Sequence, residues 1–183
     1  MDALLRYSLY QIAYSILFLE IFLMIFFAIA IVCTKTITKW NQRRRADIKL
    51  GISSIIQSAL LSEESDPNVV IPKKLQHYRD LVEILEEFNY RFNSDKWNNI
   101  KEKVIAQYLK PMINSYAHSF TWFKRLLAAR TYLLNPSGAD EKILERFLND
   151  SKYLVRVTAA SCIIQGSNQP LFYKVINQMS HET

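Results

Sequence analysis

Two short stretches, FKRLLAAR at residues 123–130 and LVRVTAAS at residues 154–161, set the expected architecture because they repeat one pattern at a fixed offset. In each stretch an arginine follows an apolar residue by two positions and precedes a pair of alanines by three and four. Arg125 in the first stretch therefore corresponds to Arg156 in the second. The same offset separates the two alanine pairs, Ala128-Ala129 and Ala159-Ala160. Because paired alanines leave a flat strip where a second helix can approach closely, the repeat predicts an array of packed helical units.

The turn before each stretch extends the pattern. Asp150 precedes Arg156 by six residues, and Ser119 precedes Arg125 by the same distance. A carboxylate at such a turn can accept hydrogen bonds from backbone N–H groups at the start of the helix and can meet the arginine of an adjacent unit. The pattern resembles the HEAT repeat, a pair of antiparallel helices with a proline in the first helix, an aspartate at the turn and an arginine in the second helix.

The resemblance covers residues 96–166. Pro111, Ser119 and Arg125 keep the HEAT spacing in the first copy, with serine in place of aspartate, and in the second copy Lys142 stands where the proline is expected. The 31-residue period is closer to the short HEAT-like repeats of bacterial proteins than to longer forms of about 40–47 residues. The resemblance implies a small α-solenoid, and an unrelated helical bundle is the alternative.

The rest of the chain after residue 45 also has helical periodicity and no sustained alternation typical of strands, so the predicted class is all-α. The expected helices cover residues 46–62, 75–92, 96–117, 119–134, 140–149, 152–165 and 169–180. Residues 63–74, with Pro67 and Pro72, break the pattern and are the predicted linker. In a solenoid, residues 75–92 would cap one end, and residues 169–180 would begin a third repeat or cap the other.

The most apolar stretch is residues 9–33, LYQIAYSILFLEIFLMIFFAIAIVC. As a helix this stretch reaches about 37 Å, enough to cross a hydrocarbon layer of about 30 Å with some tilt. We therefore expect four parts: a tail and transmembrane helix at 1–34, a basic juxtamembrane helix at 35–62, the linker at 63–74 and a HEAT-like domain at 75–183. A cleaved signal peptide is the alternative, but its basic region would precede the apolar run rather than follow it.

The net charge of the chain is +6, and the location of its basic residues predicts the orientation of this helix. Residues 1–49 hold seven Lys or Arg against three acids, which accounts for +4, and the rest of the chain is nearly balanced. The basic residues after the span are Lys35, Lys39, Arg43, Arg44 and Arg45. By the positive-inside rule, residues 34–183 lie in the cytoplasm and the N-terminus outside. A nucleic-acid partner is not expected, because such domains spread basic charge over their folded body.

One acid, Glu20, lies within the apolar stretch. An ionised carboxylate at that depth is costly, so Glu20 is a candidate contact with another membrane helix. The alternative is a neutral carboxyl group that bonds to Ser15 or Tyr14 or is simply tolerated. The stripe of Phe18, Phe22 and Phe26 is expected to face lipid.

Catalytic signals are weak. The histidines are scattered, the three glycines form no nucleotide-binding loop, and Cys33 and Cys162 are expected to be free thiols. Trp97 and Trp122 are expected in the core, although an exposed Trp122 would indicate a protein-binding surface. Trp122, Lys124 and Arg130 are therefore the candidate binding residues. Lys124 and the arginines could instead line an anion-binding groove, as in HEAT-like DNA glycosylases, but a structural role for the arginines is favoured.

The sequence as a whole predicts a single-pass protein of the bacterial inner membrane whose cytoplasmic HEAT-like array is a non-catalytic scaffold for a protein partner. No cofactor, metal or small-molecule substrate is expected. The alternatives are a lyase-like or nucleic-acid-acting enzyme on the same repeats, which needs an exposed cluster of basic and acidic residues in a groove, and an accessory subunit of a membrane enzyme that binds through Glu20.

Overall fold

The computed structural model describes residues 2–62, 67–166 and 171–176, and in these ranges it holds helices and no strand, which confirms the all-α class. The α-helices are α1 (Asp2–Leu61), α2 (Tyr78–Arg91), α3 (Asp95–Val104), α4 (Lys110–Ala117), α5 (Trp122–Leu134), α6 (Glu141–Leu148) and α7 (Tyr153–Gln165). Shorter helices are η1 (Lys73–Leu75), η2 (Ile105–Leu109) and η3 (Pro136–Gly138). The chain divides into two compact units, Met1–Asp47 and Ile48–Thr183.

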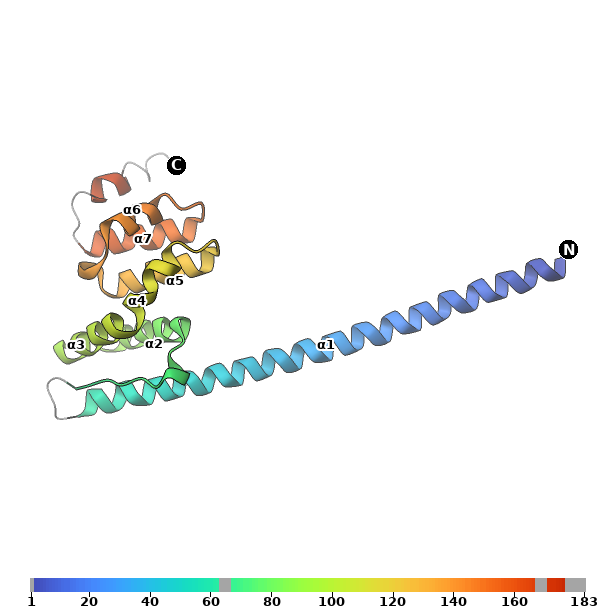
Figure 1. The fold of residues 1–183 in the computed structure, drawn as a ribbon, viewed down its shortest axis with the longest axis horizontal. Helices are drawn as coiled ribbons and strands as arrows, with labels where there is room; N and C mark the ends of the chain where they lie inside the picture. Colours follow the sequence, from blue (N-terminus) through green and yellow to red (C-terminus); the bar gives the residue numbers. More distant parts are fainter. Residues whose placement is uncertain (1, 63–66, 167–170, 177–183) are drawn as a thin grey trace. The chain divides into compact units, whose positions relative to one another are not determined.

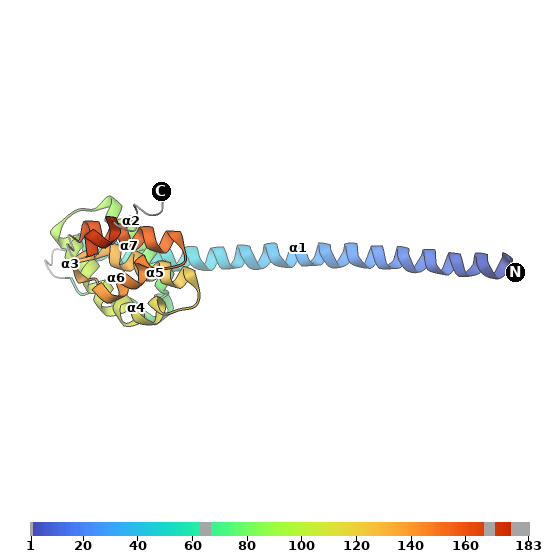
Figure 2. The ribbon, with the colours of Figure 1, turned by 90° about the horizontal axis from the view of Figure 1, so that it is seen from above.

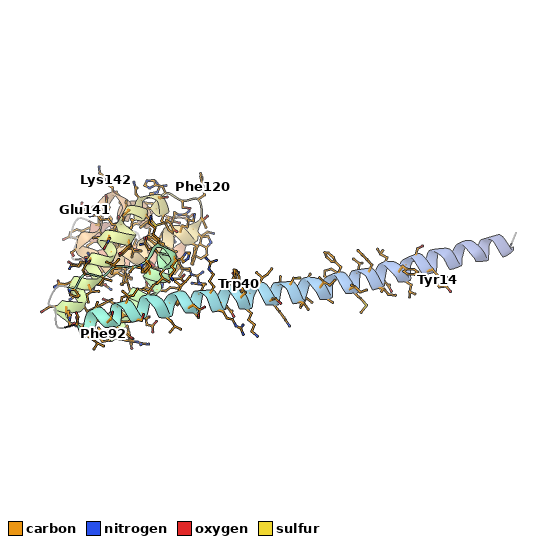
Figure 3. The ribbon with its side chains drawn as sticks, turned by 60° about the horizontal axis from the view of Figure 1, so that its bottom comes forward. Tyr14, Trp40, Phe92, Phe120, Glu141 and Lys142 are labelled. Atoms are coloured by element: carbon orange, nitrogen blue, oxygen red, sulfur yellow. The ribbon has the colours of Figure 1, made fainter. Side chains whose placement is uncertain are left out.

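The first unit is the N-terminal part of α1. Its apolar side chains are exposed at almost every position from Tyr14 to Val32, on all sides of the helix. Figure 3 shows these side chains projecting all round the helix, with Tyr14 and Trp40 labelled. Among the described residues, α1 is the one helix that is long and apolar enough to cross a membrane. The expected helix at 46–62 is not separate, because α1 continues through it to Leu61.

The second unit begins inside α1. Ile48, Ile52 and Ile56 recur at four-residue spacing, which places them on one face of the helix, and all three are buried in the core. Val69 and Ile71, which the sequence placed in the linker, are 3% and 1% exposed in the same core. The end of α1 and the segment that contains Val69 and Ile71 therefore form part of the core of the second unit. They are not a spacer in front of it.

The predicted helix at 96–117 has three parts, α3, the π-helix η2 and α4. Pro111 is the second residue of α4 and has no N–H to donate to the carbonyl four residues back. Just before it, the Lys110 N–H bonds to the carbonyl of Ile105, five residues back, which widens the helix by one residue. The proline thus explains why a continuous apolar pattern contains an irregular turn.

Helix α5 is at the centre of the second unit. It packs against α4, α7 and α2, while α6 packs on α7. In Figure 1 the helices follow one another from green (α2, α3) through yellow (α4, α5) to orange (α6, α7), and Figure 2 shows the same helices from above. The Tyr78 and Thr131 hydroxyls, 2.8 Å apart and buried, join α2 to α5.

The last predicted helix lies partly outside the described residues. Residues 171–176 are helical, with Leu171 and Val175 buried, whereas 167–170 and 177–183 are not described. Trp97, expected in the core, is fully buried and packs beside Phe88, with 5.7 Å between their ring centroids.

Candidate functional site

The turns before α5 and α7 have the same hydrogen bonds, at positions related by the repeat period. Arg125 Nη1 donates to the carbonyl oxygen of Ser119 at 2.9 Å, and Arg156 Nη1 donates to that of Asp150 at 2.9 Å. Ser119 Oγ accepts the N–H of Thr121 at 3.2 Å. Asp150 Oδ1 accepts the N–H of Lys152 at 2.9 Å, so the two side chains hold equivalent positions. The two turns, 31 residues apart in the sequence, therefore share these hydrogen bonds.

An ion pair connects the two turns. Arg125 donates from Nε to Asp150 Oδ2 at 2.5 Å and from Nη2 to Asp150 Oδ1 at 3.0 Å. The side chains are 14% and 6% exposed. Burial opposes the charged form of Asp150, but the bonds from Arg125 and the Lys152 N–H outweigh it and lower the pKa of the carboxyl group. The sequence predicted that the aspartate before one helix would meet the arginine of the neighbouring helix. The bonds between Asp150 and Arg125 are that contact.

The alanine pairs lie where close helix packing needs them. Ala128, Ala129 and Ala159 are fully buried, and Ala160 is half-buried against the core. Their small side chains let α5 and α7 approach, and these two helices make the most extensive contact in the unit. These residues are structural, as are Arg125 and Asp150.

Exposed apolar side chains gather at the same two turns. Trp122 and Tyr153 are the first residues of α5 and α7, lie 31 residues apart in the sequence, and are 40% and 61% exposed. Phe120 is fully exposed and Leu154 is 53% exposed. We call these four residues the turn edge. Trp122 is thus not a core residue, and its exposure agrees with the alternative interpretation of a binding surface.

The other two candidate binding residues lie in different surroundings. Lys124 is exposed one turn into α5, with its Nζ 5.5 Å from the ring centroid of Tyr116. Arg130 lies two turns further along α5 and pairs with Glu86, with 2.7 Å from Nε to Oε1. The hydrogen bond that Arg130 donates to Glu86 raises the pKa of the guanidinium group. Trp122 and Lys124 therefore share one end of α5, and Arg130 belongs to the helix pairing with α2.

A groove of about 750 Å³ lies between η2 and α4 on one side and α6 on the other, and the end of α5 also lines it. Ile105, Ile113 and Ile143 give it an apolar part. Its charged or ionisable lining residues are Glu102, Lys110, His118, Asp140, Lys142 and Arg146. The lining is therefore mixed, and Figure 3 labels Lys142 with its neighbour Glu141 at the start of α6.

A second groove, of about 730 Å³, lies beside the ends of α2 and α5 and includes Arg130 and Glu86. Lys101 lines it and donates to Asn89 Oδ1 at 2.9 Å. Burial lowers the pKa of Lys101. Because Arg130, Glu86 and Lys101 all bond within the protein, this groove presents satisfied polar groups.

The candidate residues of α1 are surface residues. Glu20, Lys35, Lys39, Arg43 and Arg44 are exposed, and Arg45 is half-buried. Three threonines that alternate with Lys35 and Ile37 directly after the apolar stretch bond to their own helix. Thr34, Thr36 and Thr38 donate their hydroxyls to carbonyls four residues back at 2.6, 2.8 and 2.8 Å. The hydroxyl groups of these three threonines therefore have acceptors within α1 itself.

Metal and thiol chemistry finds little support in the part of the chain that the structure describes. No group of three His, Cys, Asp or Glu there could hold a metal ion. His118 Nδ1 lies 2.9 Å from the Asn114 carbonyl, and His181 lies outside the described residues. Cys33 is exposed, whereas burial of Cys162 raises the pKa of its thiol to about 11.

Sequence reasoning missed two features of the surface. Tyr153 could have been found by adding the repeat period to Trp122, because equivalent positions of a repeat occupy equivalent places. The groove between α4 and α6 could not have been found from the sequence, because it depends on the spacing between those two helices. No protein family model, curated protein or solved structure matches this chain.

Proposed function

We propose that this protein is a membrane-anchored, non-catalytic binding module. Residues 9–33 cross the bilayer once, residues 34–183 lie on the cytoplasmic side, and the HEAT-like helices form a short solenoid that binds a protein partner. The anchor restricts the module to the membrane surface and so raises its effective concentration for a partner located there.

The exposed apolar surface of α1 supports the anchor. In a water-soluble helix one face is buried, yet from Tyr14 to Val32 apolar side chains are exposed on every face. The bonded threonine hydroxyls of residues 34–38 suit a segment leaving the hydrocarbon, where an unsatisfied donor is costly. The cluster of cations that follows favours the cytoplasmic side for the second unit.

The mixed lining of the groove between α4 and α6 is the observation that carries the binding role. Binding sites for proteins combine apolar contact area with polar groups that set orientation, and this groove offers three isoleucines beside six charged or ionisable residues. An enzyme built on the same repeats needs a cluster of basic and acidic residues in a groove, and this lining contains basic and acidic residues too. The arginines of the repeat pattern and of α5 distinguish the two functions, because an enzyme would need them free to act on substrate. Arg125 and Arg130 instead form ion pairs with Asp150 and Glu86.

A steric block of the groove tests this role. Ala106 lines the groove and is exposed, so Ala106→Trp fills the groove without disturbing the core. Gln107→Trp is the matched control, because Gln107 is the next residue of η2, is exposed and does not line the groove. A photo-crosslinking residue at Asn114 or Lys142 in the groove reports contact in native membranes, and one at Tyr90 outside it is the reference.

We expect a discrete crosslinked protein from the groove positions and none from Tyr90. Ala106→Trp should abolish that product and Gln107→Trp should leave it unchanged. Equal crosslinking at all three positions, or a product that resists Ala106→Trp, would contradict a partner in the groove.

The exposure of Glu20 supports a second candidate function, as an accessory subunit of a membrane complex. Its side chain is exposed among apolar neighbours on α1, where a membrane partner could accept or donate a hydrogen bond. Co-purification from mild detergent compares Glu20→Leu with Glu20→Gln, which keeps hydrogen bonding without charge. Loss of a partner in Glu20→Leu and its retention in Glu20→Gln would support this role; unchanged partners in both variants would exclude it.

A further inference from the structure

The turn edge is a projecting surface rather than a pocket. Phe120 is fully exposed, and Trp122, Tyr153 and Leu154 are between 40% and 61% exposed. None of the four lines either of the two grooves described above. Apolar side chains that project in this way can insert into the boundary between headgroups and acyl chains of a bilayer.

The charge around the turn edge is positive. Lys124 and Lys152 are exposed within two residues of Trp122 and Tyr153. The sequence has no Asp or Glu in residues 103–139 or 151–181. The one acid at these turns, Asp150, is engaged by Arg125 and is 6% exposed. The surface that fits the turn edge is therefore anionic.

A chain of contacts connects the turn edge to the start of the second unit. Lys49 Nζ lies 2.6 Å from Glu83, and Glu83 lies 2.7 Å from Arg79 Nε. The Arg79 guanidinium in turn lies 4.9 Å from the ring centroid of Phe123, the residue after Trp122. Within the second unit, the turn edge is therefore linked through α2 to the segment of α1 that contains Lys49.

We propose that the turn edge docks onto the surface of an anionic bilayer, the same bilayer that holds the anchor. This inference rests on the proposed membrane anchor. Aromatic rings prefer the interface between hydrocarbon and water, and lysines are attracted by anionic headgroups. Only the helical segment 34–48, about 22 Å long at 1.5 Å per residue, separates the apolar stretch from Lys49, which keeps the second unit near the bilayer that holds the anchor. Docking at two successive turns would fix the orientation of the helical unit and leave the groove between α4 and α6 to the partner.

Quenching of tryptophan by brominated lipid tests the proposal with the full chain in nanodiscs. Trp40→Phe keeps Trp122 and the buried Trp97, and Trp40→Phe/Trp122→Phe keeps Trp97 alone as the matched control. We expect quenching of the first variant in nanodiscs that contain about 30% anionic lipid, none in the control, and little for either in zwitterionic nanodiscs. Lys124→Glu/Lys152→Glu should reduce the docked population about tenfold or more, and so should high salt.

The anchor has its own readout. Trp122→Phe keeps Trp40, which follows shortly after Cys33, and quenching of Trp40 in both lipid mixtures reports insertion of α1 whether or not the turn edge docks. Quenching of Trp40 without quenching of Trp122 overturns the docking proposal and leaves the proposed function standing. Absence of both overturns the anchor as well. A protein crosslinked from position 120 in native membranes, with Trp122 unquenched, would assign the turn edge to a protein partner instead.

Discussion

Replacing Asp150 with serine tests the physical basis of the repeat. In the first copy Ser119 occupies the equivalent position and accepts the N–H of Thr121 at 3.2 Å. Asp150→Ser therefore keeps a hydroxyl that can accept the N–H of Lys152 and removes only the charge that faces Arg125. Asp150→Ala removes the charge and the cap together.

The expected loss follows from the geometry of the ion pair. Opposite charges about 4 Å apart attract by about 4 kcal/mol at an effective dielectric constant of about 20. The side chains are only 14% and 6% exposed, so removing Asp150 leaves a mostly buried guanidinium group. Arg125 Nη1 keeps the carbonyls of Ser119 and Phe120 at 2.9 and 3.0 Å, which limits the loss. We expect Asp150→Ser to lower the free energy of unfolding by about 2–4 kcal/mol, and Asp150→Ala by about 1 kcal/mol more.

Urea unfolding in detergent measures these losses, with the fluorescence of buried Trp97 as the signal in a Trp40→Phe/Trp122→Phe background. Glu87→Ser is the control, because Glu87 and Arg91 form an exposed pair, 49% and 59% exposed, whose loss should cost less than about 1 kcal/mol. Adding Asp150→Ser to Arg125→Met should cost little more than Arg125→Met alone. A loss for Asp150→Ser no larger than that for Glu87→Ser would refute the view that this pair holds the two turns together.

Further predictions concern the core and its charges. Burial opposes ionisation of Glu83, but bonds from Lys49 and Arg79 outweigh it and lower its pKa to about 2, against about 4.3 for an unfolded chain. Its stabilisation is therefore complete above about pH 5 and is lost as the pH falls toward 2, so the urea midpoints of wild type and Glu83→Gln should differ at pH 7 and converge near pH 2. Cys162, with a thiol pKa raised by burial to about 11, should resist alkylation at pH 8 until the protein is denatured, as mass spectrometry would show; rapid labelling of the folded protein would contradict its burial. Trp97→Ala should cost about 3–5 kcal/mol in thermal or urea unfolding, because a fully buried indole is replaced by a cavity; a loss below about 1 kcal/mol would contradict this packing.

Local patterns predicted well what depends on local chemistry. The all-α class, the positions of most helices and the contact between Asp150 and Arg125 follow from periodicity and from one fixed offset. Pro111 was assigned only a HEAT-like position, and the π-helix before it was missed, although the proline has no N–H to donate to the carbonyl four residues back. Residues 63–74 read as a linker because prolines interrupt their periodicity, yet Val69 and Ile71 are buried, since an extended segment can also cover a core.

The candidate site was harder to predict than the fold. Trp122, Lys124 and Arg130 lie within nine residues on one helix, but the intervening turns of helix place Trp122 at one end and Arg130 toward the other, beside Glu86. The groove joins residues from α3, η2, α4, α5, η3 and α6, and no spacing in the sequence encodes its width. The exposure of a side chain and its pairing with a residue far away in the sequence depend on how the helices pack. A pattern in one sequence indicates them only indirectly.

The side of the membrane on which the second unit lies is the sharpest test of the proposed function. The assay places one reactive cysteine at Tyr90, which is 95% exposed in the second unit, in a full chain that carries Cys33→Ser and Cys162→Ser. A membrane-impermeant maleimide is then added to right-side-out and to inverted vesicles of the inner membrane. We expect labelling of position 90 in inverted vesicles only, in a protein that stays in the membrane after washing at pH 11. Labelling in right-side-out vesicles, or release of the protein by the wash, would contradict a cytoplasmic module anchored by α1.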